Sequence, residues 1–470
     1  MSLDWDAIVI GAGPAGMAAA ATLAEGGART LLLDEQAEPG GQIYRAVERN
    51  RDKARLSAIL GPDYLRGAAL VDRLRASGAS LRFSTSVWRV EEGPIVWSRT
   101  DGRIAHERAG ALVIATGAME RPVPVAGWTL PGVMTVGAMQ ILLKSSGLAP
   151  SGRLVLAGTG PLFYLFARQC LEAGAEHLTL LDTAQTRNIP AALPHFPRAL
   201  TGQGWRYLTK GIGLLAALST GRAKIFRGVT GIAIEGEAQA ASVRFLSGGK
   251  PQQLDCDLVG LHEGVIPQQQ MTRSLGCDHR WDEGQACFHP RRDEWGRSTK
   301  PGVFIAGDAG GIVGAEASRH EGEAAALAIL AELGRIAPAE RDARLQAVRK
   351  ARGAHLSARP FLDRLYRPRA DLATPPDAVT ICRCEAISAG SLRLAVARGA
   401  LGPNQAKAYL RVGMGPCQGR LCGPSVTGLI ARETNRGEDE TGYYRVRDPL
   451  KPITVAELAS ASRQESRHES

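Results

Sequence analysis

The sequence predicts an α/β protein with two Rossmann-like, doubly wound dinucleotide-binding domains, the second inserted in the first, and a small helical domain near the C-terminal end. Two observations indicate this fold class. A strand–glycine turn–helix–strand unit occurs twice, and a compact group of cysteines follows both copies. A chain of 470 residues with 44% hydrophobic residues can bury the cores that these domains need, which excludes a disordered or collagen-like chain.

The first unit begins almost at the start of the chain. Residues 7–10 have the apolar pattern of a buried strand and run directly into a glycine-rich turn, residues 11–16. An alanine-rich helix over residues 17–25 follows, and a second strand over residues 30–33 ends at Asp34. Strand, glycines, helix, second strand and acid all occur in order, and this order predicts a dinucleotide site.

Each residue type in this turn has a physical reason to be there. Gly11 allows the tight turn, and Gly13 lets the backbone approach a pyrophosphate. Gly16 allows the helix to pack closely on the strand, and the helix N-terminus faces the phosphates. Asp34 is placed to accept hydrogen bonds from a ribose.

The second unit, residues 154–182, repeats the plan with a poorer fingerprint. Gly158 and Gly160 form its turn, but Phe163 stands where the third glycine belongs and predicts poorer packing of helix on strand. Asp182 would repel a 2′-phosphate, so any ligand would be NAD(H) rather than NADP(H). A working nicotinamide site and a vestigial structural repeat both stay open.

A third strand and glycine turn, residues 302–308, leads into a helix over residues 315–333. This order predicts that the second dinucleotide domain is inserted into the first. A polar stretch, residues 459–470, predicts disorder. The expected boundaries are residues 1–125 and 291–335 for the first domain, 126–290 for the inserted domain, 336–376 for a helical linker, 377–435 for the cysteine domain and 436–470 for a C-terminal tail.

The eight cysteines are unevenly placed. Cys170, Cys256, Cys277 and Cys287 are scattered, as small buried hydrophobic residues would be. The others form two pairs that can hold a [2Fe-2S] cluster or a zinc ion. The pairs alone leave both metals open. The predicted metal ligands are Cys382, Cys384, Cys417 and Cys422.

Composition and the chain ends indicate the partners and the localisation to expect. The net charge is +10, but the basic residues are spread along the chain, so we expect no nucleic-acid partner. The N-terminus lacks the features of a signal peptide, and no uninterrupted apolar run long enough to span a membrane occurs. We expect a cytoplasmic protein without a transmembrane segment, either free or peripheral to the inner membrane.

Three further segments carry a family resemblance. Pro39-Gly-Gly41-Gln42, Ala115-Thr116-Gly117 and Ala306-Gly307-Asp308 resemble the two-dinucleotide-domain flavoproteins that include thioredoxin reductase and glutathione reductase. The resemblance implies that FAD occupies the first site and that Asp308 bonds its ribityl chain. The redox Cys-x-x-Cys of those reductases has no counterpart in residues 132–140. The implied FAD contacts are Gly11, Gly13, Pro14, Ala15, Gly16, Asp34, Glu35, Gly41, Gln42, Ala115, Thr116, Gly117, Gly307 and Asp308.

The cysteine segment resembles the bacterioferritin-associated ferredoxin (BFD) type of domain. The pattern stands here as Cys382-Arg-Cys384-Glu385 followed by Gly413-Met-Gly415-Pro-Cys417-Gln-Gly419-Arg-Leu-Cys422. The resemblance implies a small helical domain that holds a [2Fe-2S] cluster. Helices that start near Ser388 and after Leu421 would point their N-termini toward the anionic cluster.

Over nearly its whole length the chain resembles the alpha subunits of heteromeric amino-acid and opine dehydrogenases. This group holds the B-subunit of hydrogen cyanide synthase, the A-subunit of opine oxidase and the alpha subunit of D-hydroxyproline dehydrogenase. The strings that carry the resemblance are residues 39–45, 127–133, 292–297 and the cysteine segment. It implies an electron-transfer role beside a beta subunit that resembles glycine and D-amino-acid oxidases. Some relatives hold FMN between subunits or a different adenine nucleotide in the first site, and a small ferredoxin-like gamma subunit is a further partner that the resemblance allows.

Two other functions stay open. The chain would be a self-sufficient NADH:acceptor flavin oxidoreductase if the second unit binds NADH. It would be a non-enzymatic, nucleotide-bound scaffold if the cysteines hold only zinc. No hydrolytic grouping is present in the sequence, no catalytic residue is assigned, and His262, His279, His289 and His320 are expected to be surface or satisfied core residues.

Overall fold

The computed structural model of the chain describes residues 3–460, and residues 461–470, most of the stretch expected to be disordered, lie outside it. Its first sheet has the strand order β3-β2-β1-β6-β5-β4, and β19 pairs with β6 beside that row. Parallel pairing joins β3, β2, β1 and the end of β6. The strands are β1 (Trp5–Ile10), β2 (Thr30–Leu33), β3 (Ser80–Arg82), β4 (Thr85–Glu91), β5 (Ile95–Thr100), β6 (Arg103–Ile114) and β19 (Val303–Ile305).

Strand β6 pairs antiparallel in its first half and parallel in its second half. Its first half pairs antiparallel with β5, which in turn pairs with β4. Its second half, residues 109–114, pairs parallel with β1 on one side and with β19 on the other. The central strands are apolar and buried on both faces, as parallel strands between two covering layers require.

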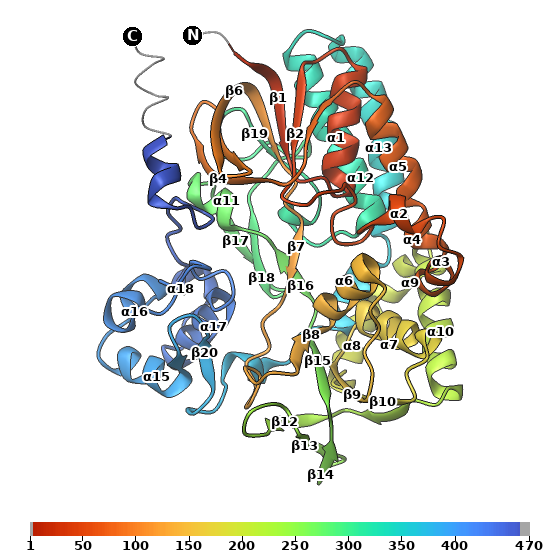
Figure 1. Cartoon of the computed structure of the whole chain (residues 1–470), viewed down its shortest axis with the longest axis vertical. Coiled ribbons are helices and arrows are strands. Elements are labelled where there is room, and N and C mark those ends of the chain that lie inside the picture. The colour runs from red at the N-terminus through yellow and green to blue at the C-terminus, as the bar shows by residue number, and fades with distance from the viewer. Residues whose placement is uncertain (1–2, 461–470) are drawn as a thin grey trace.

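Helices cover this sheet, and Figure 1 shows α1, α5, α12 and α13 running side by side on one side of it. The small residues of α1 and α12 allow close approach, since a side chain at Gly322 would overlap the backbone of Ala15. The helices of this part are α1 (Pro14–Glu25), α2 (Val47–Asn50), α3 (Ala54–Leu60), α4 (Pro62–Leu65), α5 (Gly67–Ala76), α12 (Ala315–Glu332) and α13 (Pro338–Leu356).

The second sheet has the order β11-β10-β9-β15-β8 and is parallel throughout. The chain enters it through β7 and leaves it through β16, and these two strands pair antiparallel between the two sheets (Figure 1). The second dinucleotide unit therefore lies within the first, as predicted. Its elements are β7 (Ala118–Glu120), β8 (Val133–Thr135), α6 (Val136–Ser146), β9 (Arg153–Gly158), α7 (Pro161–Ala173), β10 (His177–Asp182), β11 (Lys224–Arg227), β15 (Leu258–His262) and β16 (Val265–Pro267).

Three smaller groups of elements complete this region and the return to the first sheet. A helical run follows β10, a three-stranded antiparallel sheet follows β11, and a hairpin precedes β19. They are η1 (Thr186–Asn188), α8 (Ile189–Ala192), η2 (Leu193–His195), α9 (Phe196–Ala199), α10 (Gly204–Thr220), β12 (Thr230–Glu235), β13 (Ser242–Ser247), β14 (Lys250–Asp255), α11 (Gln270–Ser274), β17 (His279–Asp282), β18 (Cys287–Pro290) and η3 (Gly307–Gly310).

The cysteine domain is a separate helical body at one side of the molecule (Figure 1), with its own buried core around Leu392 and Leu429. The indole of Trp128 in the inserted domain donates to the carbonyl of Thr380 at 2.7 Å, which anchors the start of this domain. Its elements and those of the preceding linker are α14 (Arg359–Leu365), η4 (Ala370–Ala373), β20 (Thr380–Cys382), β21 (Ile387–Ser388), α15 (Ala389–Ala397), α16 (Pro403–Leu410), α17 (Gly423–Glu433) and α18 (Glu438–Thr441).

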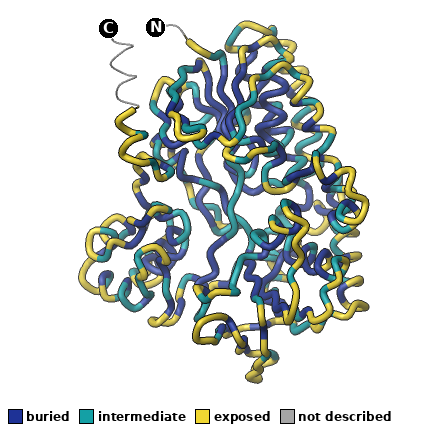
Figure 2. The backbone as a smooth tube through the Cα atoms, in the orientation of Figure 1, coloured by how far each residue is buried: buried dark blue, intermediate teal, exposed yellow. Residues whose placement is uncertain are grey.

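Residues 443–451, which we call the C-terminal strap, run from the cysteine domain back to the first sheet (Figure 1). Val446 and Leu450 are buried in the core beneath β1 and β6, and the amide of Leu450 donates to the carbonyl of Trp88 at 2.6 Å. Figure 2 shows the interior strands of both sheets buried and the exposed residues gathered on the outer helices and loops. Part of the predicted tail is therefore an ordered tie between two domains.

Candidate functional site

The first glycine turn is shaped by close backbone contacts. Gly11 has φ +104°, and a side chain there would overlap the carbonyl oxygen of Ala115 at the end of β6. A Cβ on Gly16 would overlap the carbonyl oxygen of Gly11, so helix and turn touch at this point. Gly13 caps α1 without a side-chain hydrogen bond, and Pro14 follows at the first helical position. The first amides of α1 are thus left for a ligand, as an anion site at a helix N-terminus requires.

Asp34 closes the turn from the end of β2. Its carboxylate accepts from the amide of Ala12 at 2.5 Å and from the amide of Gln36 at 2.7 Å. Burial raises the pKa of Asp34, and the two amides oppose that rise. Next to it, Glu35 forms an ion pair of 2.6 Å with Lys451 of the strap. The strap therefore reaches the edge of the first dinucleotide site.

The predicted loop with Gly41 and Gln42 lies directly on this turn. A Cβ on Gly41 would be 2.7 Å from the Cα of Gly13, so only glycine fits there. The carbonyl of Gln42 accepts from Nζ of Lys144 at 3.1 Å, which links the loop to α6 of the inserted domain. Sequence reasoning missed Lys144, because nothing near it in the chain marks it as a partner of this loop.

Two polar atoms at this site are buried and find no hydrogen-bond partner within residues 3–460. They are Oγ1 of Thr116 and Nε of Arg45. A buried polar group without a partner costs free energy, on the order of 1–3 kcal/mol. Both residues flank the loop and the turn, so a polar ligand that lies between them would satisfy these atoms.

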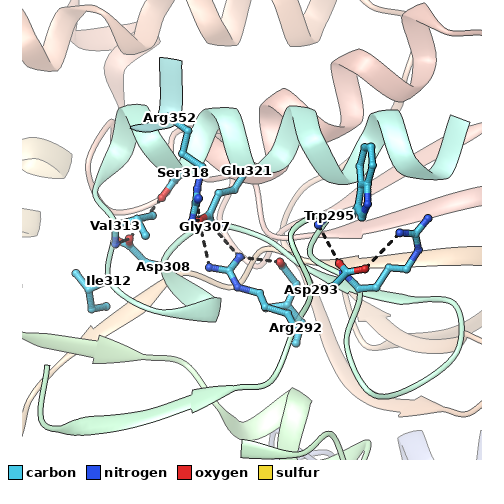
Figure 3. A network of polar contacts seen from close by, with 12 residues as sticks. Arg292, Asp293, Trp295, Gly307, Asp308, Ile312, Val313, Ser318, Glu321 and Arg352 are labelled. Atoms are coloured by element: carbon cyan, nitrogen blue, oxygen red, sulfur yellow. Dashed lines mark hydrogen bonds and ion pairs between the residues drawn. The ribbon is translucent and has the colours of Figure 1, made fainter. Parts of the chain in front are cut away.

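Asp308 lies at the start of η3 in a network of polar contacts (Figure 3). Its Oδ1 accepts from the amides of Val313 and Gly314 at 2.8 and 2.9 Å. Burial, opposed by these amides, raises the pKa of Asp308. The amide of Gly307 donates to Glu321 at 3.0 Å, which fixes the η3 turn to α12.

Glu321 is itself held by two arginines (Figure 3). Arg292 comes from a string that carries the family resemblance, and Arg352 was not singled out from the sequence. Arg292 donates to the carboxylate of Glu321 at 2.7 Å and Arg352 at 2.8 Å. Burial alone would raise the pKa of Glu321, but the two guanidinium groups hold it below its usual value. A buried carboxylate paired in this way stays charged and gives the η3 turn a rigid support.

The second unit has similar strands but a covered acid. Asp182 is 8% exposed, and its carboxylate accepts from the hydroxyl of Tyr164 at 3.0 Å and the amide of Ala184 at 2.9 Å. The ring of Tyr366, from the linker after α14, lies 6.0 Å from that of Tyr164. Burial, with smaller opposing hydrogen bonds, raises the pKa of Asp182. A ribose would have to displace Tyr164 to reach this carboxylate.

Phe163, which stands where the third glycine belongs, lies in the core of the inserted domain. Its ring is 0% exposed and belongs to the core formed by Leu154, Leu156 and Leu180 of the second sheet. The ring of Phe163 fills the space between α7 and the strands β9 and β10. Gly158 keeps the role of a first glycine, because a side chain there would overlap the carbonyl oxygen of His262.

The four clustered cysteines form two contacting pairs. Cys382 shares a side-chain hydrogen bond with Cys422, and Cys384 shares one with Cys417. In the described part of the chain, no three or more His, Cys, Asp or Glu side chains form a ready site for a single ion. Two thiol pairs match a two-iron cluster, in which two cysteines bind each iron, better than one tetrahedral zinc.

Hydrogen bonds converge on one of these sulfurs. The bond from Cys422, followed by backbone amides of Gly413, Glu385 and Cys384, lowers the pKa of Cys382 to about 6. Amides that point at a sulfur favour its thiolate form, which is the form that binds metal. The helices expected here are α15, capped by Ser388, and α17, which starts directly after Cys422.

The four scattered cysteines are buried, and the four histidines named from the sequence each have a hydrogen-bond partner. Cys170, Cys256, Cys277 and Cys287 are all buried. Among the histidines, His262 contacts Glu120 at 2.7 Å, His279 contacts Thr272, His289 contacts Gln285 and His320 contacts Glu323. Between residues 3 and 460 no helix is long and apolar enough to cross a membrane.

Comparison with known proteins shows the class of protein to which the chain belongs. Residues 5–324 match the family described as pyridine nucleotide-disulphide oxidoreductase, and residues 380–432 match the BFD-like [2Fe-2S] binding domain. The crystal structure of L-proline dehydrogenase from P. horikoshii has the same fold, with a TM-score of 0.71 and 20% identity over 97% of this chain and 79% of that one. The chain is an FAD-dependent oxidoreductase with FAD and a [2Fe-2S] cluster as its cofactors.

Individual relatives narrow this class. The chain is 52% identical to the A-subunit of opine oxidase from Rhizobium meliloti (strain 1021), over 98% of this chain and 99% of that protein. It is 31% identical to hydrogen cyanide synthase subunit HcnB of Pseudomonas aeruginosa, over 95% and 96% of the two chains. The chain therefore belongs to the family of the opine oxidase A-subunit, within the pyridine nucleotide-disulphide oxidoreductases.

Proposed function

We propose that this chain is the electron-transfer (alpha) subunit of a heteromeric dehydrogenase that oxidises the C–N bond of an amino acid or secondary amine. The substrate would be an opine, hydroxyproline or a glycine-like compound. The observation that carries the proposal is the contrast between Asp34, which accepts from backbone amides, and Asp182, which the hydroxyl of Tyr164 covers. With its acid covered, the second unit would not bind a nicotinamide nucleotide, so electrons would enter from another chain, and the relatives are themselves named as subunits.

The residues of the first site would divide the binding of FAD among them. Gly11, Gly13, Pro14, Ala15 and Gly16 would admit the pyrophosphate to the open N-terminus of α1. Asp34 and Glu35 would face the adenosine ribose. Bound FAD would supply the capacity to take up and pass on electrons.

The other predicted contacts would hold the rest of the cofactor. Gly41 and Gln42 approach the turn from one side, and Thr116, between Ala115 and Gly117, offers a hydroxyl that still lacks a partner within residues 3–460. Gly307 and Asp308 would be held against the ribityl chain by the Glu321 network. A rigid support of this kind fixes the geometry of a bound cofactor without contacting it.

Cys382, Cys384, Cys417 and Cys422 would hold the [2Fe-2S] cluster, which supplies a one-electron carrier. The partner would be a flavoprotein beta subunit that resembles glycine and D-amino-acid oxidases and binds the substrate. FMN at the subunit interface and a small ferredoxin-like gamma subunit would complete such an assembly. The complex would work in the cytoplasm or at the inner face of the membrane and pass electrons to an external acceptor.

The test is an anaerobic visible spectrum of the purified chain before and after NADH is added. We expect flavin and iron–sulfur bands that NADH leaves unbleached, and no dye reduction by the chain alone with glycine, opines or hydroxyproline. Bleaching by NADH would instead make the chain a self-sufficient oxidoreductase. Zinc without flavin after reconstitution would make it a scaffold.

Variants of single cysteines sharpen this test. Cys382→Ser should remove the iron–sulfur bands and keep the flavin bands, because it deletes a proposed ligand. Cys256→Ala, at a buried thiol of the inserted domain, is the matched control and should keep both sets of bands. Iron–sulfur bands that survive in Cys382→Ser would contradict the ligand assignment.

A further inference from the structure

The C-terminal strap lies beyond both family matches, the second of which ends at residue 432. Its first two residues, Tyr443 and Tyr444, turn back onto the cysteine segment. Tyr444 is 2% exposed and belongs to the core of the cysteine domain. The strap is therefore part of the cluster site and also its tie to the first sheet.

Glycines of the cysteine segment form a slot for the ring of Tyr444. A Cβ on Gly413 would be 2.5 Å from its Cζ, and a Cβ on Gly419 would overlap its Cδ2. Both glycines have positive φ, +82° and +76°, so their backbone bends around the ring. A ring clamped from two sides keeps its hydroxyl in one direction.

The hydroxyl of Tyr444 points toward Cys422, a proposed cluster ligand. The hydroxyl oxygen of Tyr444 is 3.7 Å from Sγ of Cys422, and Cys422 is also only 2% exposed. A cysteine bound to iron is a thiolate without a proton, so the tyrosine hydroxyl would be the donor. Cys382, at the other end of this pair, is served by backbone amides instead.

Tyr443 keeps the strap in register. The guanidinium carbon of Arg273 lies 4.1 Å from the ring centre of Tyr443 and 4.8 Å from that of Phe288 in β18. A side chain at Gly423 would overlap the hydroxyl of Tyr443, so this ring is also held against α17. Arg273 and Phe288 thereby fix the position from which Tyr444 reaches Cys422.

We propose that Tyr444 tunes the reduction potential of the [2Fe-2S] cluster by donating a hydrogen bond to Cys422. The inference rests on the proposed role of the four cysteines as cluster ligands. Reduction adds one negative charge to the cluster, and a donor at a ligand sulfur stabilises the more negative state more strongly. The hydroxyl therefore raises the potential at which the cluster accepts an electron.

The experiment is a redox titration of the full chain, followed by the EPR signal of the reduced cluster. Tyr444→Phe keeps the ring in its slot and removes the donor, so we expect unchanged iron content and a more negative midpoint potential. Tyr409→Phe is the matched control, because Tyr409 lies in the same domain and is 58% exposed. A midpoint potential in Tyr444→Phe equal to that of the wild type would overturn the proposal.

A second measurement does not depend on the stability of that variant. Incorporation of 3-fluorotyrosine makes the hydroxyl a stronger donor in the wild-type chain and should move the potential in the positive direction. Absence of this shift would also count against the proposal. If the wild-type chain shows no iron–sulfur EPR signal, the proposed function fails, whereas a signal with an unmoved potential removes only the role of Tyr444.

Discussion

The two dinucleotide units of this chain share their topology and differ in what fills their ligand side. In both, the first glycine lies against a carbonyl oxygen at the end of the neighbouring parallel strand, Ala115 for Gly11 and His262 for Gly158. The third position is Gly16 in one unit and the fully buried Phe163 in the other. The first glycine is required by a close backbone contact in both units, whereas the third is required by such a contact only in the first unit.

The acids at the ends of β2 and β10, Asp34 and Asp182, also differ between the two units. Asp34 accepts hydrogen bonds from the backbone amides of Ala12 and Gln36 in its own turn. Asp182 is held by the side chain of Tyr164, with Tyr366 packed beside it. Two units with the same strand order can therefore differ in the residues that surround the acid, and Tyr164 and Tyr366 make that difference here.

The largest effect is expected when the third position of the first unit receives a side chain, as the third position of the second unit has one. Gly16→Val should abolish FAD binding, because its Cβ would overlap the carbonyl oxygen of Gly11. The flavin absorbance per mole of purified chain measures this. Gly353→Val is the control, since a Cβ at Gly353 meets nothing within 4 Å. Full flavin content in Gly16→Val would break the comparison.

A substitution at the third position of the second unit should have the opposite effect: it should lower the stability of the protein and leave its cofactor content unchanged. Phe163→Ala should lower the free energy of unfolding by about 3–5 kcal/mol, since it leaves a cavity in a closed core. Its FAD content should not change. Phe196→Ala, at a ring that is 39% exposed, should cost less than about 1 kcal/mol in the same denaturant titration. Equal losses in the two variants would contradict this assignment.

The two acids offer a finer comparison. Asp34→Asn should weaken FAD binding by about tenfold or more, because hydrogen bonds to a charged group contribute on the order of 1.5–3 kcal/mol. Asp182→Asn should leave the affinity for FAD unchanged. Quenching of FAD fluorescence during titration of the apoprotein measures both. A similar loss in the two variants would mean that both units contact the cofactor.

A last comparison concerns the contact between the two units. Burial, and then the charge of Arg45, lowers the pKa of Lys144 to about 7. The unfolded chain, in which the lysine has its usual pKa near 10.4, binds more protons between pH 7 and pH 10. The free energy of unfolding should therefore rise with pH by up to about 1.4 kcal/mol per unit in that window.

Substitution separates this contribution from the other titrating groups. Lys144→Met should flatten the rise over the same window in denaturant titrations at several pH values. Lys350→Met, at an exposed position of α13, should keep the full slope. A slope that survives in Lys144→Met would assign the pH dependence to other residues.

Sequence reasoning succeeded where the signal is local. The glycine turns, the flanking strands, the nesting of the second unit and the helices next to the cysteines each follow from residues close together in the chain, and the family resemblance and both cofactors are confirmed. The individual FAD contacts and the domain boundaries stay predictions.

What could not be predicted depends on contacts between distant segments. Tyr366 lies beside Tyr164 only because the linker folds back over the inserted domain, and no pattern near Tyr366 announces that contact. Arg352 supports Asp308 through Glu321 from a different helix. Tyr444 is distant in the chain from Gly413, yet the two are shaped to each other. Such pairs become visible only when the chain is folded.

The strap also has a consequence for the order in which the protein is made. All four cluster cysteines precede Tyr443 and Tyr444 in the chain, so the ribosome releases the thiols before the rings that cover them. Lys451, which closes the strap on Glu35 beside the first glycine turn, is released later still. During synthesis Cys422 is thus made before the ring that later lies against it, and the last tie to the flavin domain follows.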